Sequence, residues 1–558
     1  MNASLIAIIS FFLLLASYRF YGNFLREKIF QINNKEKSPA VERDDGVEYV
    51  PTNKWILFGH QFASIAGLGP IVGPAIAVIW GWVPALLWVV LGSIFIGGVH
   101  DFGALATSLD YKGRGIGDIT EEIVGKRAKN LFLIIIFFLL ALAMGVFAIL
   151  IAGLFGKFHE VIIPVFGLIG VAMIFGIALK KLGVPLIPAS IIGVGLNLGL
   201  ILVGIQNPVE WGTSEQWITI LLVYAMFASV LPVWLLLTPR DYLNSYKLYV
   251  FLGAITLGLF FGQEKFQMVA PAIQPVVEGA PSMFPFLFIT IACGAISGFH
   301  CLVSSGTTVR QLEKRTDSQM LGYGAMLLEG AFAVLVILAC TSGVGQDFWN
   351  KNYAAWNSIE GGALSSFIVG GGNMISSIGL DVTFSQTFVA VVTIAFAMTT
   401  LDSATRLLRY NVEEIGKSFK LKKLENKYIA GIVAVVSIAF FAFMKIGGKP
   451  AGLTLWSLFG TTNQLLGGLA LLVITVWLAK SKKPTWLTYW PMMFLFSMTI
   501  WAMIINLKNF YAAKQWEPLF VGFGIFILAI FIIQESFQVL KKRNTGENSR
   551  HKDQIIQK

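Results

Sequence analysis

Two stretches of the chain set polar side chains among glycines inside long apolar runs. The first is GHQFASIAGLGPIVGP at 59–74, and the second is CGAISGFHCLVSSGTT at 293–308. Proline removes a backbone donor and clashes with the preceding turn. A membrane helix tolerates such losses only where protein or a wet cavity satisfies the freed groups. We therefore expect helix interruptions near Ala66–Pro70 and Ser297–Ser305, of the kind that holds an ion or a small charged substrate.

The two stretches share a pattern. His60 precedes Ser64 by four residues, and His300 precedes Ser304 by four. The alternative interpretation is a kinked helix with close glycine packing, which is common in membrane bundles. The candidate substrate-binding residues of the two stretches are His60, Gln61, Ser64, Gly67, Gly69, His300, Ser304, Ser305 and Thr307.

Three further motifs place polar groups at membrane depth. Glu329 lies in MLLEGAF and is either a proton carrier or a structural partner, because a buried carboxylate must be protonated, paired or hydrated. The motif MTTLDSATRLLRY at 398–410 offers hydroxyl and carboxylate oxygens that suit Na⁺, although Asp402 has a possible i+4 partner in Arg406. The candidate residues of these motifs are Thr399, Thr400, Asp402 and Ser403 for an ion, and Asn463 and Gln464 of LFGTTNQLLGG for substrate.

A metal site is a weak alternative. Three histidines, His60, His100 and His300, lie in or beside apolar spans. Asp101 directly follows His100. No two of these histidines have the i, i+3 or i+4 spacing of a preformed ligand pair, so we expect no metal and no cofactor. The three cysteines show no disulfide framework and no CxxC pair.

The elements that position these groups are membrane-spanning helices. Hydrophobic residues make up 56% of the 558 residues and charged residues 13%, against about 25% charged in soluble proteins. Apolar runs long enough to cross a bilayer recur along the chain. We expect fifteen spans, at 2–22, 55–79, 84–104, 131–154, 161–179, 185–205, 217–237, 248–262, 284–302, 320–341, 381–401, 428–444, 453–478, 486–506 and 517–538.

Basic residues predict the orientation of these spans. With the N-terminus outside and the C-terminus in the cytoplasm, most of the 42 Lys and Arg residues fall in inner segments, as the positive-inside rule requires. The basic inner segments account for the net charge of +11. Their lysines are attracted to anionic lipid, so no nucleic-acid partner is expected.

The order of the spans predicts an inverted repeat. The span at Trp55 runs outward, whereas the span at Phe284 runs inward, and opposite orientation is what an inverted-topology repeat requires. We expect an all-α, LeuT-type five-plus-five fold. Its segments are 1–54 (first helix and inner loop), 55–205 (first repeat), 206–283 (two inserted helices), 284–478 (second repeat), 479–538 (two last helices) and 539–558 (disordered tail).

The motifs resemble those of the carbon starvation protein A (CstA) family of peptide and pyruvate transporters. The resemblance rests on GHQFASIAGLGPIVGP, ISGFHCLVSSGTT, GYGAMLLEG, LDSATRLLRY and LFGTTNQLL, which occur in this order. It implies a plasma-membrane transporter of the amino acid–polyamine–organocation superfamily. It also implies that substrate binds at the two interruptions and that a cation lies between Ala66 and the hydroxyl-rich motif. The chain is shorter than the larger members, with a compact outer segment at 342–380, and carries His100 where glutamine is expected.

The expected function is therefore secondary active uptake of peptides or pyruvate by alternating access, coupled to H⁺ or Na⁺, during carbon starvation. An amino-acid symporter of the same superfamily is one alternative, and a nutrient sensor without transport is another. No nucleotide-binding P-loop, H-E-x-x-H or G-x-S-x-G motif is present, so we do not expect an enzyme. The sequence does not fix the oligomeric state.

Overall fold

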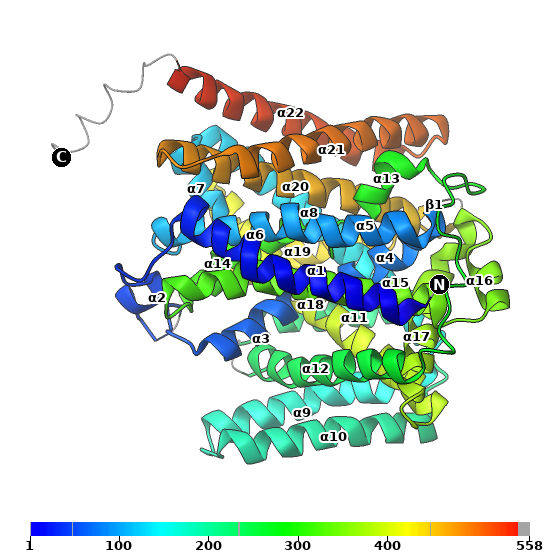
Figure 1. Cartoon of the computed structure of the whole chain (residues 1–558). Coiled ribbons are helices and arrows are strands. Elements are labelled where there is room, and N and C mark those ends of the chain that lie inside the picture. Colours follow the sequence, from blue (N-terminus) through cyan, green and yellow to red (C-terminus); the bar gives the residue numbers. More distant parts are fainter. Residues whose placement is uncertain (1, 47, 233–234, 447, 545–558) are drawn as a thin grey trace.

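The protein is a bundle of long, roughly aligned helices with two small strands at one end (Figure 1). The computed structural model describes residues 2–46, 48–232, 235–446 and 448–544. The helices of the first half are α1 (Ala3–Phe24), α2 (Pro39–Glu42), α3 (Lys54–Ile65), α4 (Gly69–Ala77), α5 (Trp82–Gly92), α6 (Gly98–Asp110), α7 (Ile116–Ile123), α8 (Lys126–Phe155), α9 (Ile162–Lys180), α10 (Leu186–Gln206), α11 (Ser214–Val230) and α12 (Leu237–Phe261).

The second half continues the same architecture. A two-stranded antiparallel hairpin pairs Lys445 with Pro450 between two of its helices. Its elements are α13 (Met283–Thr290), α14 (Gly298–Gly306), α15 (Ala325–Ser342), α16 (Gln346–Asn352), α17 (Ile359–Ser376), α18 (Val382–Ser418), α19 (Lys427–Ala442), β1 (Lys445–Ile446), β2 (Lys449–Pro450), α20 (Gly452–Lys480), α21 (Trp486–Ala512) and α22 (Trp516–Asn544).

Among the described residues, 11 helices are long and apolar enough to cross a membrane, or up to 12 if the bent pair α3 and α4 is one span. The protein is thus a multi-pass, mainly helical membrane protein. The expected spans at 217–237 and 428–444 fall on the shorter apolar helices α11 and α19. The span expected at 284–302 falls on α13 and α14. The count of fifteen spans stays a prediction.

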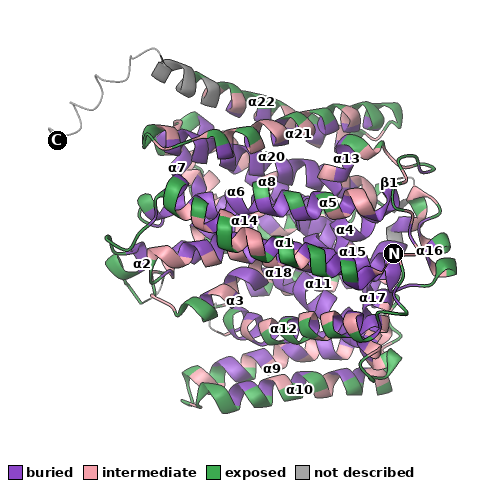
Figure 2. Cartoon of the chain, viewed as in Figure 1, coloured by how far each residue is buried: buried purple, intermediate pink, exposed green. Residues whose placement is uncertain are grey.

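The centre of the bundle is built from helices that are buried on nearly every face. In the most apolar window of α20, 94% of the residues are buried, and 78% are buried in those of α8 and α18. The corresponding fraction for α10 is 22%, so α10 lies at the edge. Figure 2 shows the same contrast, with buried residues in the middle and exposed ones along α10, α21 and α22.

The two edges of the bundle are formed by helix pairs. Helices α9 and α10 pack mainly on each other at one edge, and α21 and α22 lie at the opposite edge (Figure 1). Helix α12 lies between the α9–α10 pair and the centre, where it contacts α3, α17 and α18. Helix α11 contacts α8, α18 and α19. The inserted pair expected at 206–283 therefore packs more centrally than α9 and α10 do.

The C-terminal helix is longer than expected. Helix α22 continues to Asn544, so residues 539–544 of the segment expected to be disordered are helical. A basic and polar sequence can extend a helix beyond its apolar span, since Lys and Arg have good helix propensity. The remaining residues of the expected tail, 545–558, lie outside the described part of the chain.

Candidate functional site

The first predicted helix interruption is present. Helix α3 ends at Ile65, and α4 begins at Gly69 with a proline in its first turn, where the missing N–H costs nothing. The two helices meet at an angle of 48°. Ala66 has φ −78° and ψ 54°, which is not helical. Residues 66–68 thus form a short non-helical connection in the middle of an apolar span.

Close packing accounts for the glycines of this connection. A methyl group at Gly67 would collide with the Thr400 side chain on α18, and one at Gly69 would collide with Cys293. A methyl group at Gly73 would lie 2.6 Å from the carbonyl oxygen of Thr290. The alternative interpretation expected tight glycine packing, and this packing is present in the structure. It occurs together with the helix interruption.

The second interruption lies N-terminal to its predicted position. Helix α13 ends at Thr290 and α14 begins at Gly298, so residues 291–297 are the non-helical part. Gly294 has φ +89° and lies against Pro70, which brings the two interruptions together. The expected position near Ser297–Ser305 is wrong by several residues, because the break ends at Ser297 and the rest of that stretch is α14.

Local hydrogen bonds explain why this serine- and glycine-rich stretch is helical. Ser305 Oγ donates to the Cys301 carbonyl at 2.6 Å, and Cys301 Sγ donates to the Gly298 carbonyl at 3.0 Å. The start of α14 is capped from another helix, since Asn463 Oδ1 on α20 accepts from the Phe299 N–H at 3.0 Å. Small polar residues here satisfy themselves within the helix and do not break it.

A buried acid–histidine network lies beside the second interruption. His300 Nδ1 is 2.8 Å from Asp101 Oδ2, and His300 Nε2 is 3.3 Å from Glu329 Oε2. His100 Nδ1 is 2.6 Å from Asp101 Oδ1. The Gly294 N–H donates to Glu329 Oε1 at 3.1 Å. These contacts join α6, α14 and α15 to the non-helical connection 291–297 through side chains that are fully buried.

The sequence prediction missed half of this network. It assigned His300 to substrate and Glu329 to coupling, but Asp101 entered only through the metal alternative and His100 had no assigned role. A His-Asp pair inside an apolar span was the available signal, because two adjacent ionisable residues at that depth need partners. Among the described residues, no group of three or more His, Cys, Asp or Glu side chains is arranged to hold a metal ion.

The other predicted substrate residues differ in their contacts. Gln61 Nε2 donates to Ser304 Oγ at 3.1 Å, and Gln61 Oε1 accepts from the Thr308 hydroxyl. Asn463 Nδ2 donates to Ser297 Oγ at 3.0 Å. Ser305 Oγ also accepts from the Ile116 N–H. Gln464 lies apart, because its amide donates to the Phe288 carbonyl at 2.9 Å and joins α20 to α13. His60, Ser64 and Thr307 are half-buried on α3 and at the end of α14.

The hydroxyl-rich motif contacts two different elements. Thr400 packs against Gly67 at the first interruption, and Ala66 there is fully buried. Thr399 Oγ1 accepts from Asn244 Nδ2 on α12 at 2.9 Å. Ser403 is half-buried one residue beyond Asp402. The motif therefore lies next to the first interruption, and the cation site that the resemblance implies stays a prediction.

Asp402 has a different partner from the one considered in the sequence. Its carboxylate forms a buried ion pair with Arg240 of α12 and accepts from the Tyr224 hydroxyl at 2.6 Å. Arg406 donates instead to the Ala228 and Leu231 carbonyls at 2.7 and 2.6 Å. The expected pair of Asp402 with Arg406 is therefore absent, because the side chain of Arg406 points to the end of α11. Asp402 pairs instead with Arg240 on another helix. The guanidinium of Arg240 already balances the charge that a Na⁺ ion would balance.

The chain was compared with known proteins. The family model for the carbon starvation protein CstA matches residues 2–358 and 346–502. The Campylobacter jejuni peptide transporter CstA is 33% identical over 87% of this chain and 77% of its own length. The Bacillus subtilis peptide transporter CstA is 31% identical over 97% and 96%. The Escherichia coli pyruvate/proton symporter BtsT is 30% identical over 93% and 83%.

Solved structures resemble the chain only weakly. MhsT in complex with L-phenylalanine aligns with a TM-score of 0.45 at 14% identity, over 87% of this chain and 99% of that one. The family model and the relatives give the identification. The chain belongs to the carbon starvation protein CstA family of membrane transporters.

Proposed function

We propose that this protein takes up pyruvate or short peptides across the cell membrane by alternating access, driven by an inward flow of protons. The observation that carries the proposal is the buried network of His300, Asp101 and Glu329 beside the two helix interruptions. Ionisable groups inside a membrane protein commonly mark proton relays. The relationship to a pyruvate/proton symporter supports the same ion, and we do not propose Na⁺ coupling.

The substrate site that we propose lies between the two interruptions. Helix α4 starts at Gly69 and its positive N-terminal end faces Cys293 and Gly294, where a carboxylate would be stabilised. Pyruvate and peptides both carry such a group. The side chains we assign to this site are His60, Gln61, Ser64, His300, Ser304, Ser305, Thr307 and Asn463, with backbone groups of Gly67 and Gly69.

Electrostatics suggest how the proton and the substrate are coupled. Glu329 accepts from the Gly294 N–H, and Gly294 belongs to the proposed carboxylate site. A second carboxylate entering beside an ionised Glu329 would be repelled, because two like charges at close range cannot both remain ionised in a poorly solvated site. Protonation of Glu329 removes the repulsion and weakens the hydrogen bond that its carboxylate accepts from the Gly294 N–H. The proton then binds before the substrate and travels with it.

The helix layout of the transporter is also a proposal. We retain five core helices in each half, with 284–478 as the second repeat. In the first half, α11 and α12 contact the central helices, whereas α9 and α10 lie at the edge. The packing therefore favours α9 and α10 as the inserted pair, with α11 and α12 completing the first repeat in their place. An experimental structure in a second conformation would test this, since core helices move as a unit.

A flux assay tests the proposed function. Purified protein in liposomes is given labelled pyruvate or alanyl-alanine under an inward proton gradient or an inward Na⁺ gradient, with the membrane potential clamped. We expect accumulation above the external concentration of at least one substrate under the proton gradient alone. Accumulation that requires Na⁺, or the absence of any substrate flux, would contradict the proposal.

A further inference from the structure

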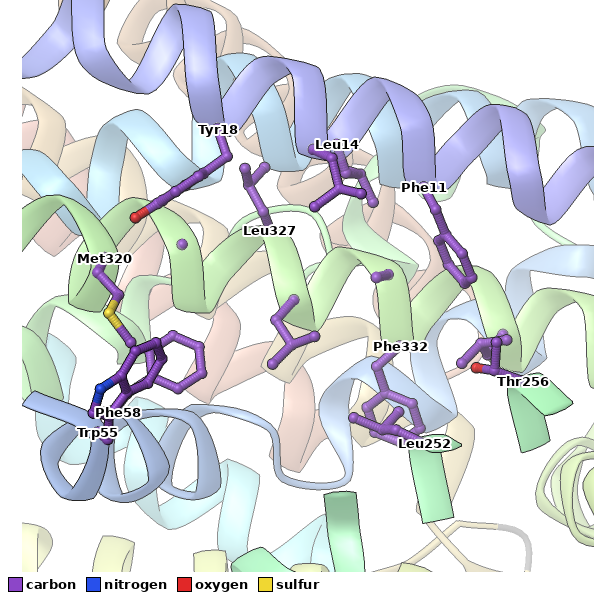
Figure 3. Close-up of a pocket in the computed structure, with 15 residues that line it drawn as sticks. Phe11, Leu14, Tyr18, Trp55, Phe58, Leu252, Thr256, Met320, Leu327 and Phe332 are labelled. Carbon is purple, nitrogen blue, oxygen red and sulfur yellow. The ribbon is translucent and has the colours of Figure 1, made fainter. Parts of the chain in front are cut away.

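An apolar groove of about 490 Å³ is lined by residues of α1, α3, α12, α15 and the segment that leads into α15. Helices α1 and α15 form its long walls, and α3 and α12 close its ends. Figure 3 shows Tyr18, Met320, Trp55 and Phe58 gathered at one end, and Phe11, Leu252, Thr256 and Phe332 at the other. Tyr18, Trp55 and Thr256 are the polar or amphipathic side chains in an otherwise hydrocarbon lining.

The shape of the groove fits a hydrocarbon chain that lies along the membrane normal. Its walls are spanning helices, so its length follows the direction of lipid tails. The lining runs from Met320, in the π-helical segment Gln319–Gly324 that leads into α15, to Leu335, which is about 22 Å at about 1.5 Å per residue. One leaflet of hydrocarbon is about 15 Å deep, half of a core of about 30 Å. A polar substrate would find few hydrogen-bond partners here, whereas an acyl chain needs none.

Positive charge gathers at the Trp55 end. Lys54 Nζ lies 5.4 Å from the centre of the Trp55 ring, and Arg19, which follows Tyr18 in the sequence, is exposed; Arg26 and Asp317 also lie near Tyr18 and carry opposite charges. In the described part of the chain neither Lys54 nor Arg19 forms an ion pair, whereas the nearby Arg26 is paired with Glu27 at 2.6 Å. Exposed tryptophan and tyrosine beside basic residues are typical of the level of lipid head groups. This end of the groove is therefore complementary to an anionic head group.

We propose that the groove is a binding site for one anionic glycerophospholipid. Its acyl chain lies between α1 and α15, and its phosphate lies near Lys54 and Arg19. The lipid would also contact α3, the first half of the interrupted helix. If the proposed transport function holds, a bound lipid braces the half-helix that must move during transport. The binding site itself does not depend on that function.

Photocrosslinking tests the site directly. Phosphatidylglycerol with a diazirine in one acyl chain is added to the purified full-length protein, and labelled peptides are identified by mass spectrometry. We expect labelling to concentrate on α1, α3 and α15. Ala331→Phe fills the groove and should lower that labelling about fivefold or more. Ile191→Phe is the matched control, because Ile191 is 70% exposed on the lipid-facing edge helix α10.

A second variant tests the head group and does not disturb packing. Lys54→Glu changes an exposed side chain and should lower the preference for phosphatidylglycerol over phosphatidylethanolamine about threefold or more. Lys508→Glu, at an exposed position on α21, should leave the preference unchanged. Lys54→Glu also tests lipid binding at the groove if Ala331→Phe fails to fold.

Three results would overturn the proposal. The first is wild-type labelling no greater on α1 and α15 than on α10. The second is labelling that Lys54→Glu leaves unchanged in both amount and lipid preference. The third is a retained mass in native mass spectrometry that matches a polypeptide or a second copy of the chain instead of a phospholipid.

Discussion

Glu329 is the residue on which the proposed proton coupling depends most. It lies 3.3 Å from His300 and accepts from the Gly294 backbone, so its charge state affects both the network and the proposed substrate site. Glutamine keeps the size and the acceptor oxygen but cannot ionise. We expect Glu329→Gln to abolish proton-driven accumulation above the external concentration. Counterflow exchange, which needs no net proton movement, should stay within about threefold of wild type, since the substrate contacts are intact.

The matched control for this variant is Glu122→Gln, which changes an exposed glutamate paired with Arg114. It should retain both activities. Loss of exchange together with loss of the folded protein in Glu329→Gln would make the glutamate a structural partner, as the alternative interpretation of the sequence holds.

The pair of Asp402 and Arg240 gives a second test at the residue scale. Both side chains are buried, so Asp402→Asn removes the close counter-ion of the guanidinium and leaves it only Asp241, at 3.6 Å. Breaking a buried pair in this way costs roughly 3–5 kcal/mol. We expect the single variant to lower the free energy of unfolding strongly. The double variant Asp402→Asn with Arg240→Gln should recover part of that loss, because the guanidinium is removed together with its close counter-ion and only Asp241 loses a partner.

The same variants distinguish an ion pair from a sodium site. If Asp402 held Na⁺, Asp402→Asn would change the dependence of transport on Na⁺, and replacing Arg240 as well would not restore stability. We expect neither result. Transport by the double variant should show the same response to Na⁺ as wild type.

Part of the site could be predicted from residue types alone. Glu329 and His300 stood out because ionisable side chains in apolar spans need partners. Their contact, and the participation of Asp101, could not be predicted, since it depends on how α14 and α15 pack and on Asp101, which is 199 residues from His300. Asp402 was recognisable in the same way, but its partner was not. A nearby arginine at i+4 was the only local candidate, whereas the actual partner lies 162 residues away.

The next prediction concerns the first helix interruption and the role of Gly67 in it. A methyl group at Gly67 would collide with the Thr400 side chain, so Gly67→Ala should destabilise the protein by about 1–3 kcal/mol. Thr400→Ala in the same chain removes the obstacle and should recover most of the stability. If the break is a substrate site, substrate affinity should remain reduced in the double variant. Tryptophan fluorescence or calorimetric titration can measure it.

Gly253→Ala is the matched control for this test. Gly253 is exposed on α12 with open space around it, and alanine favours a helix by about 0.5–1 kcal/mol. That variant should be slightly more stable and bind substrate normally. Wild-type affinity in the Gly67 double variant would show that the break serves packing only.

At the scale of elements, sequence signals differed in how well they located a break. The first interruption was predictable because Pro70 acts through the backbone, wherever the helix is packed, although Pro74 lies inside α4 without ending it. The second was misplaced because glycine and serine permit a break but do not impose one. Gly298 lies where α14 approaches α20 closely, Ser305 bonds within α14, and Ser304 accepts from Gln61 of α3. The non-helical residues 291–297 contain no proline that would have marked them.

Orientation in the membrane is a property of the whole molecule, and the distribution of basic residues predicts it. The three native cysteines are buried, so introduced cysteines can report the side. We expect Asn350→Cys to react with an impermeant maleimide in intact cells. Lys420→Cys should react only after permeabilisation, because it lies in a basic segment expected inside. The reverse pattern would invert the predicted topology.

Coupling between protons and substrate is the central claim for the whole molecule, and substrate-driven proton movement tests it most directly. Liposomes containing the protein and a pH-sensitive dye receive external alanyl-alanine or pyruvate in Na⁺-free buffer without an imposed gradient. Protein-free liposomes correct for passive entry. We predict internal acidification with wild-type protein and none with Glu329→Gln. Uptake of labelled substrate by the wild type with no change of internal pH would contradict the account.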